Sequence, residues 1–186
     1  LMDGKITYSR RKRLSLRIAP DGSLDIRAPI GMPRREIDRF LEEKADWIAT
    51  HRAQVLRDRQ QGALHAIGAE QLETLKELAR EPIYESLRRF APQMGVNYGR
   101  VTVRCQKSRW GSCSSAGNLN FNCLLALAPR EVLDYVVVHE LAHRLHMDHS
   151  AAFWQEVEKV LPDYRVCRDW LRQNGGALLA RTGENG

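Results

Sequence analysis

The stretch HELAHRLHMDH, from His139 to His149, constrains this chain more than any other feature of its sequence. It holds four of the six histidines within eleven residues. On an α-helix, residues four apart lie one turn above each other on the same face, so the rings of His139 and His143 point the same way. Two imidazoles placed like this can bind one metal ion through bonds of about 2.0–2.1 Å. The stretch therefore predicts a helix that carries part of a metal site.

Glu140 follows His139 in this helix, and we expect it to act on water rather than to bind the metal. One residue along a helix is a rotation of about 100°, which places the carboxylate beside the ion. Zinc lowers the pKa of bound water to about 7, and a neighbouring carboxylate can take the proton. Zinc peptidases use this His-Glu-x-x-His order. The other interpretation is a histidine-rich helix end, which the helix dipole favours without any metal.

A catalytic zinc usually has three protein ligands and one open position, so the motif needs a third donor. His146 lies on the same face as His139, but seven residues of helix rise about 10.5 Å, which is long for two rings on one ion. We expect His149 to be the third ligand, in a turn before a helix that Ser150 caps. Glu156 is the alternative ligand. Asp148 either orients a ligand imidazole or contributes to capping.

Sequence patterns predict a mixture of strands and helices around this segment. Alternating apolar and polar residues predict a β-hairpin at 13–29, with its turn at 20–23, and strands at 101–106 and 118–124. Helical spacing predicts helices at about 33–57, 70–90 and 130–146, the first followed by a polar break at 60–62. Pro82 is expected to kink the second helix or to divide it. The segment 107–118 is expected to be a loop or an irregular strand.

The length of 186 residues predicts one compact domain over residues 1–186. Within it we expect an N-terminal lobe at 5–60, a core at 66–175 and a flexible tail at 176–186. No apolar run reaches the roughly 18 residues of a membrane span, and the first residues resemble no secretion signal. Four widely spaced cysteines without a Cys-x-x-Cys pair indicate free thiols, which favours a reducing cytoplasm.

The formal net charge is +6, and much of the excess lies in the run Arg10-Arg11-Lys12-Arg13 and along the strand that follows. A basic run can bind the phosphates of DNA or RNA. It can equally be a solvated strand edge that its charge protects from aggregation. Both interpretations stay open, and no aromatic residues that could stack on bases are interleaved with the run.

Three segments together resemble a known family: RWGSCSSAGNLNFN, LDYVVVHELAH and HMDHSAAFWQEVEKVLPDYRVCRDWL. They are similar to the YgjP-like zinc metallopeptidases, bacterial relatives of the SprT and Spartan-like proteases. The resemblance runs from about residue 5 to residue 174. The family pattern falls on His139, Glu140, His143 and His149. The resemblance implies a zincin-like α+β fold, in which the active-site helix packs on a small antiparallel sheet, joined to the N-terminal hairpin and helix.

The resemblance also implies where a peptide or protein substrate binds. The family signature before the active-site helix falls on Trp110, Gly111, Ser112 and Cys113. In zincin folds an edge strand beside the zinc receives the substrate in extended form, so this segment or the strand after it is the expected edge. Spartan-like relatives act on proteins attached to DNA, which by analogy gives the basic run a role in binding nucleic acid.

Two functions are consistent with these residues. The first is a zinc-dependent endopeptidase, in which Zn²⁺ and one further donor stabilise the oxyanion. The candidates for that donor are Tyr164, Arg165 and Arg168. The alternative is a non-catalytic, zinc-containing nucleic-acid-binding module. Its zinc would need four protein ligands, with Asp148 or Cys113 as the fourth.

Overall fold

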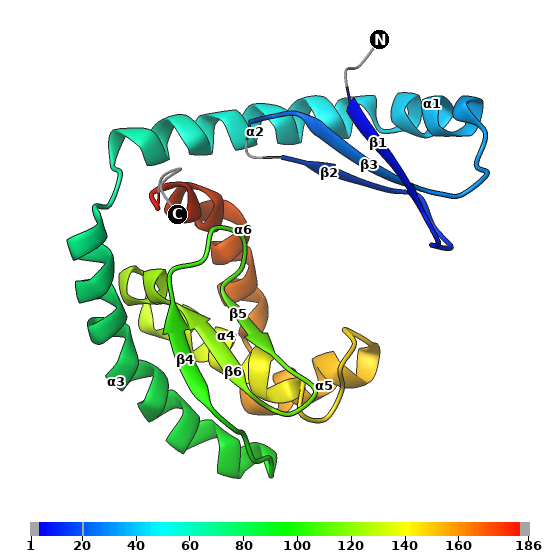
Figure 1. Cartoon of the computed structure of the whole chain (residues 1–186). Coiled ribbons are helices and arrows are strands. Elements are labelled where there is room, and N and C mark those ends of the chain that lie inside the picture. Colours follow the sequence, from blue (N-terminus) through cyan, green and yellow to red (C-terminus); the bar gives the residue numbers. More distant parts are fainter. Residues whose placement is uncertain (1–3, 20, 183–186) are drawn as a thin grey trace. The chain divides into compact units, whose positions relative to one another are not determined.

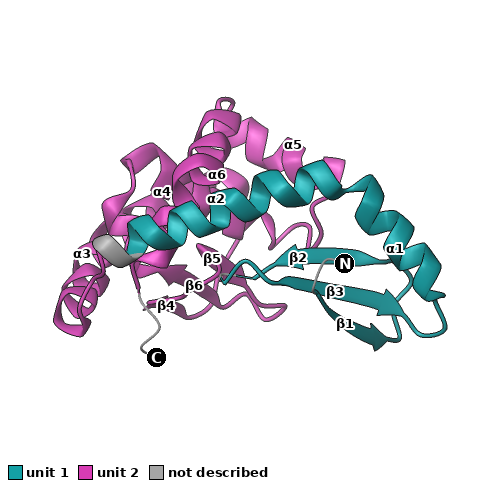
Figure 2. Cartoon of the chain, turned by 90° about the horizontal axis from the view of Figure 1, so that it is seen from above, with its two compact units in different colours: residues 1–64 teal, residues 65–186 magenta. Residues whose placement is uncertain are grey.

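The computed structural model describes residues 4–19 and 21–182, and the chain divides into two compact units, residues 1–64 and 65–186 (Figures 1 and 2). Each unit has its own hydrophobic core. In the described residues, no helix is long and apolar enough to cross a bilayer.

The N-terminal unit is built on a three-stranded sheet with the order β1-β3-β2. The strands are β1 (Gly4–Ser9), β2 (Ser15–Ile18) and β3 (Leu24–Pro29). The predicted hairpin is confirmed, because β2 and β3 pair antiparallel. Asp21 closes its turn by accepting a hydrogen bond from the Ser23 amide at 2.8 Å, while Pro20 lies outside the described residues. Sequence patterns did not predict β1, which pairs parallel with β3.

Two helices cover one face of this sheet, where the sequence predicted one. They are α1 (Arg34–Glu43) and α2 (Ala45–Leu64), separated at Lys44. Apolar residues of the helices and of β3 make the core of the unit: Leu24, Ile26, Ala28, Ile37, Leu41 and Ile48. The predicted break at 60–62 is wrong, since α2 continues through it. Glutamine is a good helix former, and one glycine costs a helix only about 1 kcal/mol.

The C-terminal unit begins with α3 (Ala69–Met94), which packs against the helices η1 (Cys123–Leu127) and α4 (Arg130–Ala142). The helix contains Pro82 but is not divided there. Its apolar face, which includes Ile83 and Leu87, is fully buried in the core, and this packing offsets the hydrogen bond that the proline lacks. The helix ends at Gly95, whose φ of 64° is the left-handed conformation that glycine adopts at helix ends.

A second three-stranded sheet follows, with the order β4-β6-β5. Its strands are β4 (Val101–Arg104), β5 (Gly111–Cys113) and β6 (Leu119–Asn122), and the short helix η1 (Cys123–Leu127) follows β6. The prediction of an antiparallel sheet is only half right. β5 pairs antiparallel with β6, but β4 pairs parallel with it. The parallel pair arises because the chain returns through β5 before it enters β6.

The helix α4 (Arg130–Ala142) passes through the core of this unit, and ten of its thirteen residues are buried. A helix that is buried on most sides accommodates the run of valines at 136–138, which by itself favours a strand. The helix ends four residues before the predicted end at 146. Two more helices complete the unit, α5 (Ala151–Val160) and α6 (Tyr164–Ala180).

The prediction of a flexible tail at 176–186 is wrong for residues 176–182, which belong to α6 or directly follow it. The helix α6 continues through Gly175, where an ideal Cβ would lie only 3.1 Å from the indole nitrogen of Trp110, so close packing accounts for this glycine. Arg181 lies beside the first residues of the unit, where its carbonyl accepts a hydrogen bond from the Ile67 amide at 2.8 Å. The remaining residues of the predicted tail, 183–186, lie outside the described residues.

Candidate metal centre

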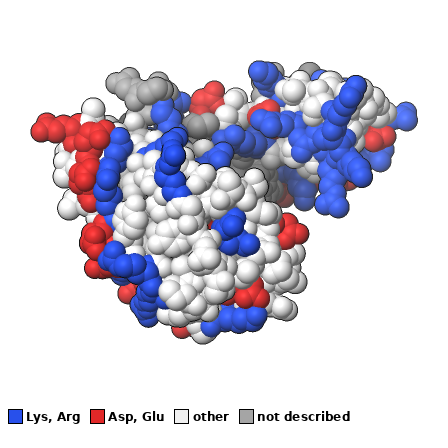
Figure 3. Space-filling model, turned by 60° about the horizontal axis from the view of Figure 1, so that its bottom comes forward, with Lys and Arg blue, Asp and Glu red and all other residues white. Residues whose placement is uncertain are grey.

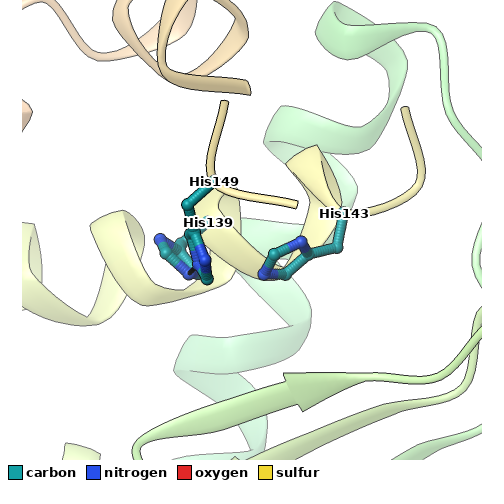
Figure 4. A group of neighbouring side chains, drawn as sticks. All are labelled: His139, His143 and His149. Atoms are coloured by element: carbon teal, nitrogen blue, oxygen red, sulfur yellow. Dashed lines mark hydrogen bonds between the residues drawn. The ribbon is translucent and has the colours of Figure 1, made fainter. Parts of the chain in front are cut away.

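Three histidines meet at the C-terminal end of α4 (Figure 4). His139 lies in the last turn of the helix, His143 is its C-cap residue, and His149 lies in the loop before α5. One ring nitrogen of each lies within 4.8 Å of the corresponding nitrogens of the other two. Nε2 of His139 lies 3.0 Å from Nε2 of His149.

The loop after α4 places His149 over the other two histidines. Arg144 and Leu145 donate backbone hydrogen bonds three residues back, to Leu141 and Ala142, and so turn the chain out of the helix. The side chain of Ser150 then caps α5 by accepting from the Phe153 amide at 3.4 Å. Asp148 accepts from the Ser150 amide at 3.3 Å, so it contributes to capping and does not belong to the histidine group.

Neighbouring groups fix the histidine rings. The Nδ1 atom of His143 lies 3.0 Å from the carbonyl oxygen of His146, which leaves Nε2 of His143 free to bind a metal. The ring of Phe153 lies against all three imidazoles, with centroid distances of 4.7–4.9 Å. Phe153 is fully buried and therefore forms an apolar floor under the group.

The donor set suits one metal ion. Burial, followed by the neighbouring imidazoles His143 and His149, lowers the pKa of His139 to about 3, and burial also lowers the pKa of His143. The imidazoles of His139 and His143 are therefore held in the neutral form that binds metals. Two nitrogens bound tetrahedrally to one zinc lie about 3.3 Å apart, which is close to the 3.0 Å between Nε2 of His139 and Nε2 of His149. In the described part of the chain the group has three members, and it includes neither Cys113 nor Glu156.

Glu140 lies beside this group in a nearly closed environment. Only 5% of its surface is exposed. Burial raises the pKa of the carboxyl group to about 8, and the charge of Arg109 acts in the opposite direction. A metal cation held by the histidines would likewise favour the ionised carboxylate. The carboxylate faces β5, where its Oε1 atom occupies the space that a side chain on Gly111 would need.

The segment that the resemblance marked as substrate-binding contains β5, one of the two edge strands of the sheet; β4 is the other. β5 pairs only with β6, whereas β6 lies between two strands and cannot be the edge. Ser112 accepts from the Asn120 side chain at 3.4 Å, and burial raises the pKa of the Cys113 thiol. Trp110 is half-buried, with its indole ring against α6. Their role in binding a substrate stays a prediction.

Sequence reasoning missed Tyr135, which lies one helical turn before His139, with its ring 5.9 Å away. The spacing of four residues was the signal that could have found it. Tyr135 begins a stack of aromatic rings that continues through the buried Tyr164 to the half-buried Trp154. The guanidinium of Arg168 lies over the rings of Trp154 and Tyr164. Arg168 is one of the three candidates for the oxyanion donor. The other two are Tyr164, which is held inside the stack, and Arg165, which pairs with Glu158 at 2.6 Å.

The basic run Arg10-Arg11-Lys12-Arg13 forms the connection between β1 and β2 in the N-terminal unit. Arg10, Lys12 and Arg13 are exposed, and Arg11 is half-buried. The run and the histidines therefore belong to different units of the chain.

Comparisons with known proteins identify a family for this chain. Residues 12–71 and 59–174 match the family described as YgjP-like, metallopeptidase domain. The comparison with curated proteins gives no match. The kinship with SprT and Spartan-like proteases stays a prediction.

Two solved structures of metallopeptidase zymogens are similar to part of the chain. Abylysin of Pyrococcus abyssi has 26% identity and a TM-score of 0.46, over 50% of this chain and 93% of that chain. Jannalysin of Methanocaldococcus jannaschii has 18% identity and a TM-score of 0.45, over 50% of this chain and 95% of that chain. Since the family match spans most of the sequence, the chain belongs to the YgjP-like metallopeptidases, enzymes that hydrolyse peptide bonds with a bound metal ion.

Proposed function

We propose that this metallopeptidase is a zinc-dependent endopeptidase, in which His139, His143 and His149 hold Zn²⁺ and Glu140 is the general base. The observation that carries the proposal is the convergence of three imidazoles within 4.8 Å of one another, with the buried carboxyl group of Glu140 on the residue that follows His139. Three protein ligands leave one coordination position open, as a catalytic zinc requires. A closed structural site would need a fourth protein ligand, and the described residues offer none in this group.

The place of Glu140 supports its role as the base, because it follows His139 in α4 and its buried carboxylate faces β5. When bound, zinc supplies a Lewis acid that polarises the scissile carbonyl and lowers the pKa of water. The carboxylate of Glu140 takes a proton from the attacking water and then gives it to the nitrogen of the leaving amine. Because Glu140 is almost fully buried, little bulk water competes for its hydrogen bonds.

The edge strand β5 suits an extended substrate. Its free side offers backbone N–H and C=O groups that a peptide can pair with as an added strand. Pairing through the main chain holds a peptide with little preference for its side chains. We therefore propose that unfolded segments of proteins are the substrates, bound along Gly111–Cys113.

Cleavage of an unfolded protein by the purified chain tests this function. We expect one equivalent of bound zinc, products cut at internal peptide bonds, loss of cleavage with a chelator and recovery when zinc is restored. Mass spectrometry of the products distinguishes internal cuts from trimming of the ends. Cleavage that persists after complete metal removal would contradict the proposal.

A second function, binding of nucleic acid, is favoured by the distribution of charge. Residues 1–64 contain 14 Lys and Arg residues and nine Asp and Glu residues. Residues 65–186 contain 15 Lys and Arg residues and 14 Asp and Glu residues. The N-terminal unit therefore carries +5 of the net charge of +6. Figure 3 shows Lys and Arg gathered over this unit. This charge supports a role in recruiting the peptidase to substrates near DNA or RNA.

The salt dependence of single-stranded DNA binding tests the second function. Neutralising Arg10 and Arg13 should weaken binding. The slope of the logarithm of the binding constant against the logarithm of the salt concentration should fall in magnitude by about 1.4, since each phosphate contact on a single strand contributes about 0.7. Neutralising Arg88 and Arg172, two exposed arginines of the other unit, is the matched control and should leave the slope unchanged. An equal effect of both pairs would show that only net charge matters.

The cellular location is also a proposal. All four cysteines carry free thiols, which is usual for proteins of a reducing cytoplasm.

A further inference from the structure

Gly111 in the edge strand β5 leaves no free space where its side chain would be. An ideal Cβ atom on Gly111 would lie 2.6 Å from Oε1, 2.7 Å from Cγ and 2.9 Å from Cδ of Glu140. Real Cβ atoms essentially never approach another atom so closely. The three nearest atoms all belong to the side chain of Glu140, which therefore fills the position of the missing methyl group.

The backbone conformation does not explain this glycine. Among the residues that the structure describes, the glycines with positive φ are Gly22, Gly31, Gly95 and Gly117, and Gly111 is not one of them. Gly111 instead lies in a regular strand, paired with Phe121 of β6, where any residue can adopt the backbone angles. The need for glycine at this position therefore comes from space alone.

The strand cannot move away to make room for a methyl group. The backbone amide of Asn122 donates to the carbonyl of Trp110 at 2.8 Å, next to Gly111. The side-chain nitrogen of the fully buried Asn122 also donates to the carbonyls of Gln106 and Arg109, at 2.7 and 2.9 Å. On the other side, the Trp110 indole is pressed against Gly175 of α6.

The helix that carries Glu140 cannot move away either. Its neighbours Val138, Leu141 and Ala142 are fully buried, and α3, α5 and α6 pack against α4. Since strand and helix are both held, a methyl group at position 111 can be relieved only by a swing of the Glu140 side chain.

We infer that Gly111 is a positioning residue, whose missing side chain sets the place of the Glu140 carboxylate between α4 and the strand that receives the substrate. Its catalytic consequence rests on the proposed function. The same strand thus fixes both the peptide and the base, so the distance from the base to the scissile bond does not depend on the substrate's side chains. A misplacement of about 1 Å in such a group can cost about 100-fold in rate.

The melting temperatures of four proteins test the contact without any assay of activity: wild type, Gly111→Ala, Glu140→Ala and the double variant. Gly111→Ala alone should lower Tm by about 3–10 °C, as expected for overpacking in a chain of this size. Glu140→Ala removes all three clashing atoms. In that background Gly111→Ala should leave Tm unchanged or raise it, because alanine restricts the unfolded chain more than glycine does. An equal fall in both backgrounds would overturn the inference.

The rate of peptide cleavage tests the catalytic consequence. Zinc-loaded Gly111→Ala should lose about 100-fold in kcat, while KM and the zinc content stay within about twofold of wild type. Gly176→Ala, at an exposed position of α6, is the matched control and should cleave like wild type. A Gly111→Ala variant with wild-type kcat would overturn the positioning role. If wild type itself cleaved nothing, the proposed function would fail, and the melting temperatures would still decide the Glu140 contact.

Discussion

Replacement of Phe153 by alanine should weaken the metal site as well as the fold. The ring is fully buried, and its centroid lies 4.9, 4.7 and 4.9 Å from those of His139, His143 and His149. Removing a buried phenylalanine costs about 3–5 kcal/mol, which corresponds to a fall in Tm of about 6–20 °C for a chain of this size. All three imidazoles also lose a packing surface, so zinc affinity should fall by about 10–100-fold, as it does when groups that orient metal ligands are removed.

Phe90→Ala separates the two effects. Phe90 of α3 is 2% exposed and belongs to the same core, but it is not part of the ring cluster around the histidines. It should lose similar stability and keep its zinc affinity, measured by competition with a chromophoric chelator at a temperature where each variant is folded. Phe153→Leu, which keeps most of the volume, covers the case in which alanine prevents folding. An equal loss of zinc affinity in Phe153→Ala and Phe90→Ala would refute the reasoning.

Three further predictions concern the same unit. Asn122→Ala should destabilise the fold by about 2–5 kcal/mol, measured by urea unfolding, because the carbonyls of Gln106 and Arg109 lose buried hydrogen bonds; a loss below about 1 kcal/mol would contradict this. Ser150→Ala should cost about 1 kcal/mol, since the cap on the Phe153 amide is lost, and should weaken zinc binding measurably. Zinc at about 1,000 times its Kd should raise Tm by about 8–16 °C, and a chelator should reverse the shift; an unchanged Tm would mean that the folded chain does not bind zinc.

Helix periodicity and capping signals together predicted which histidines of the candidate site come together. The spacing of His139 and His143 follows directly from helix geometry. His149 was placed by the order of signals after it, because Ser150 could begin a new helix and the chain had to turn before it. The helix nonetheless ends at Ala142 rather than at 146, so His143 lies at the helix end and not within it.

Long-range contacts explain what the sequence could not predict. β1 pairs in parallel with β3, the second strand of the hairpin. No pattern of neighbouring residues in the sequence predicts such a pairing. Gly175 lies within α6, and the indole of Trp110, far away in the sequence, lies against it. The same limit hid the contact of Glu140 with Gly111. Sequence motifs singled out both residues, but only the fold shows that one fills the space left by the other.

Cleavage of an unfolded protein by wild type and by Glu140→Gln, each loaded with one equivalent of zinc, tests the central claim most directly. Glutamine keeps the shape of the side chain but cannot take a proton from water. The account predicts that Glu140→Gln binds zinc like wild type and cleaves at least about 100 times more slowly, the usual contribution of a general base. Equal cleavage by the two zinc-loaded proteins would contradict the claim that Glu140 is the base.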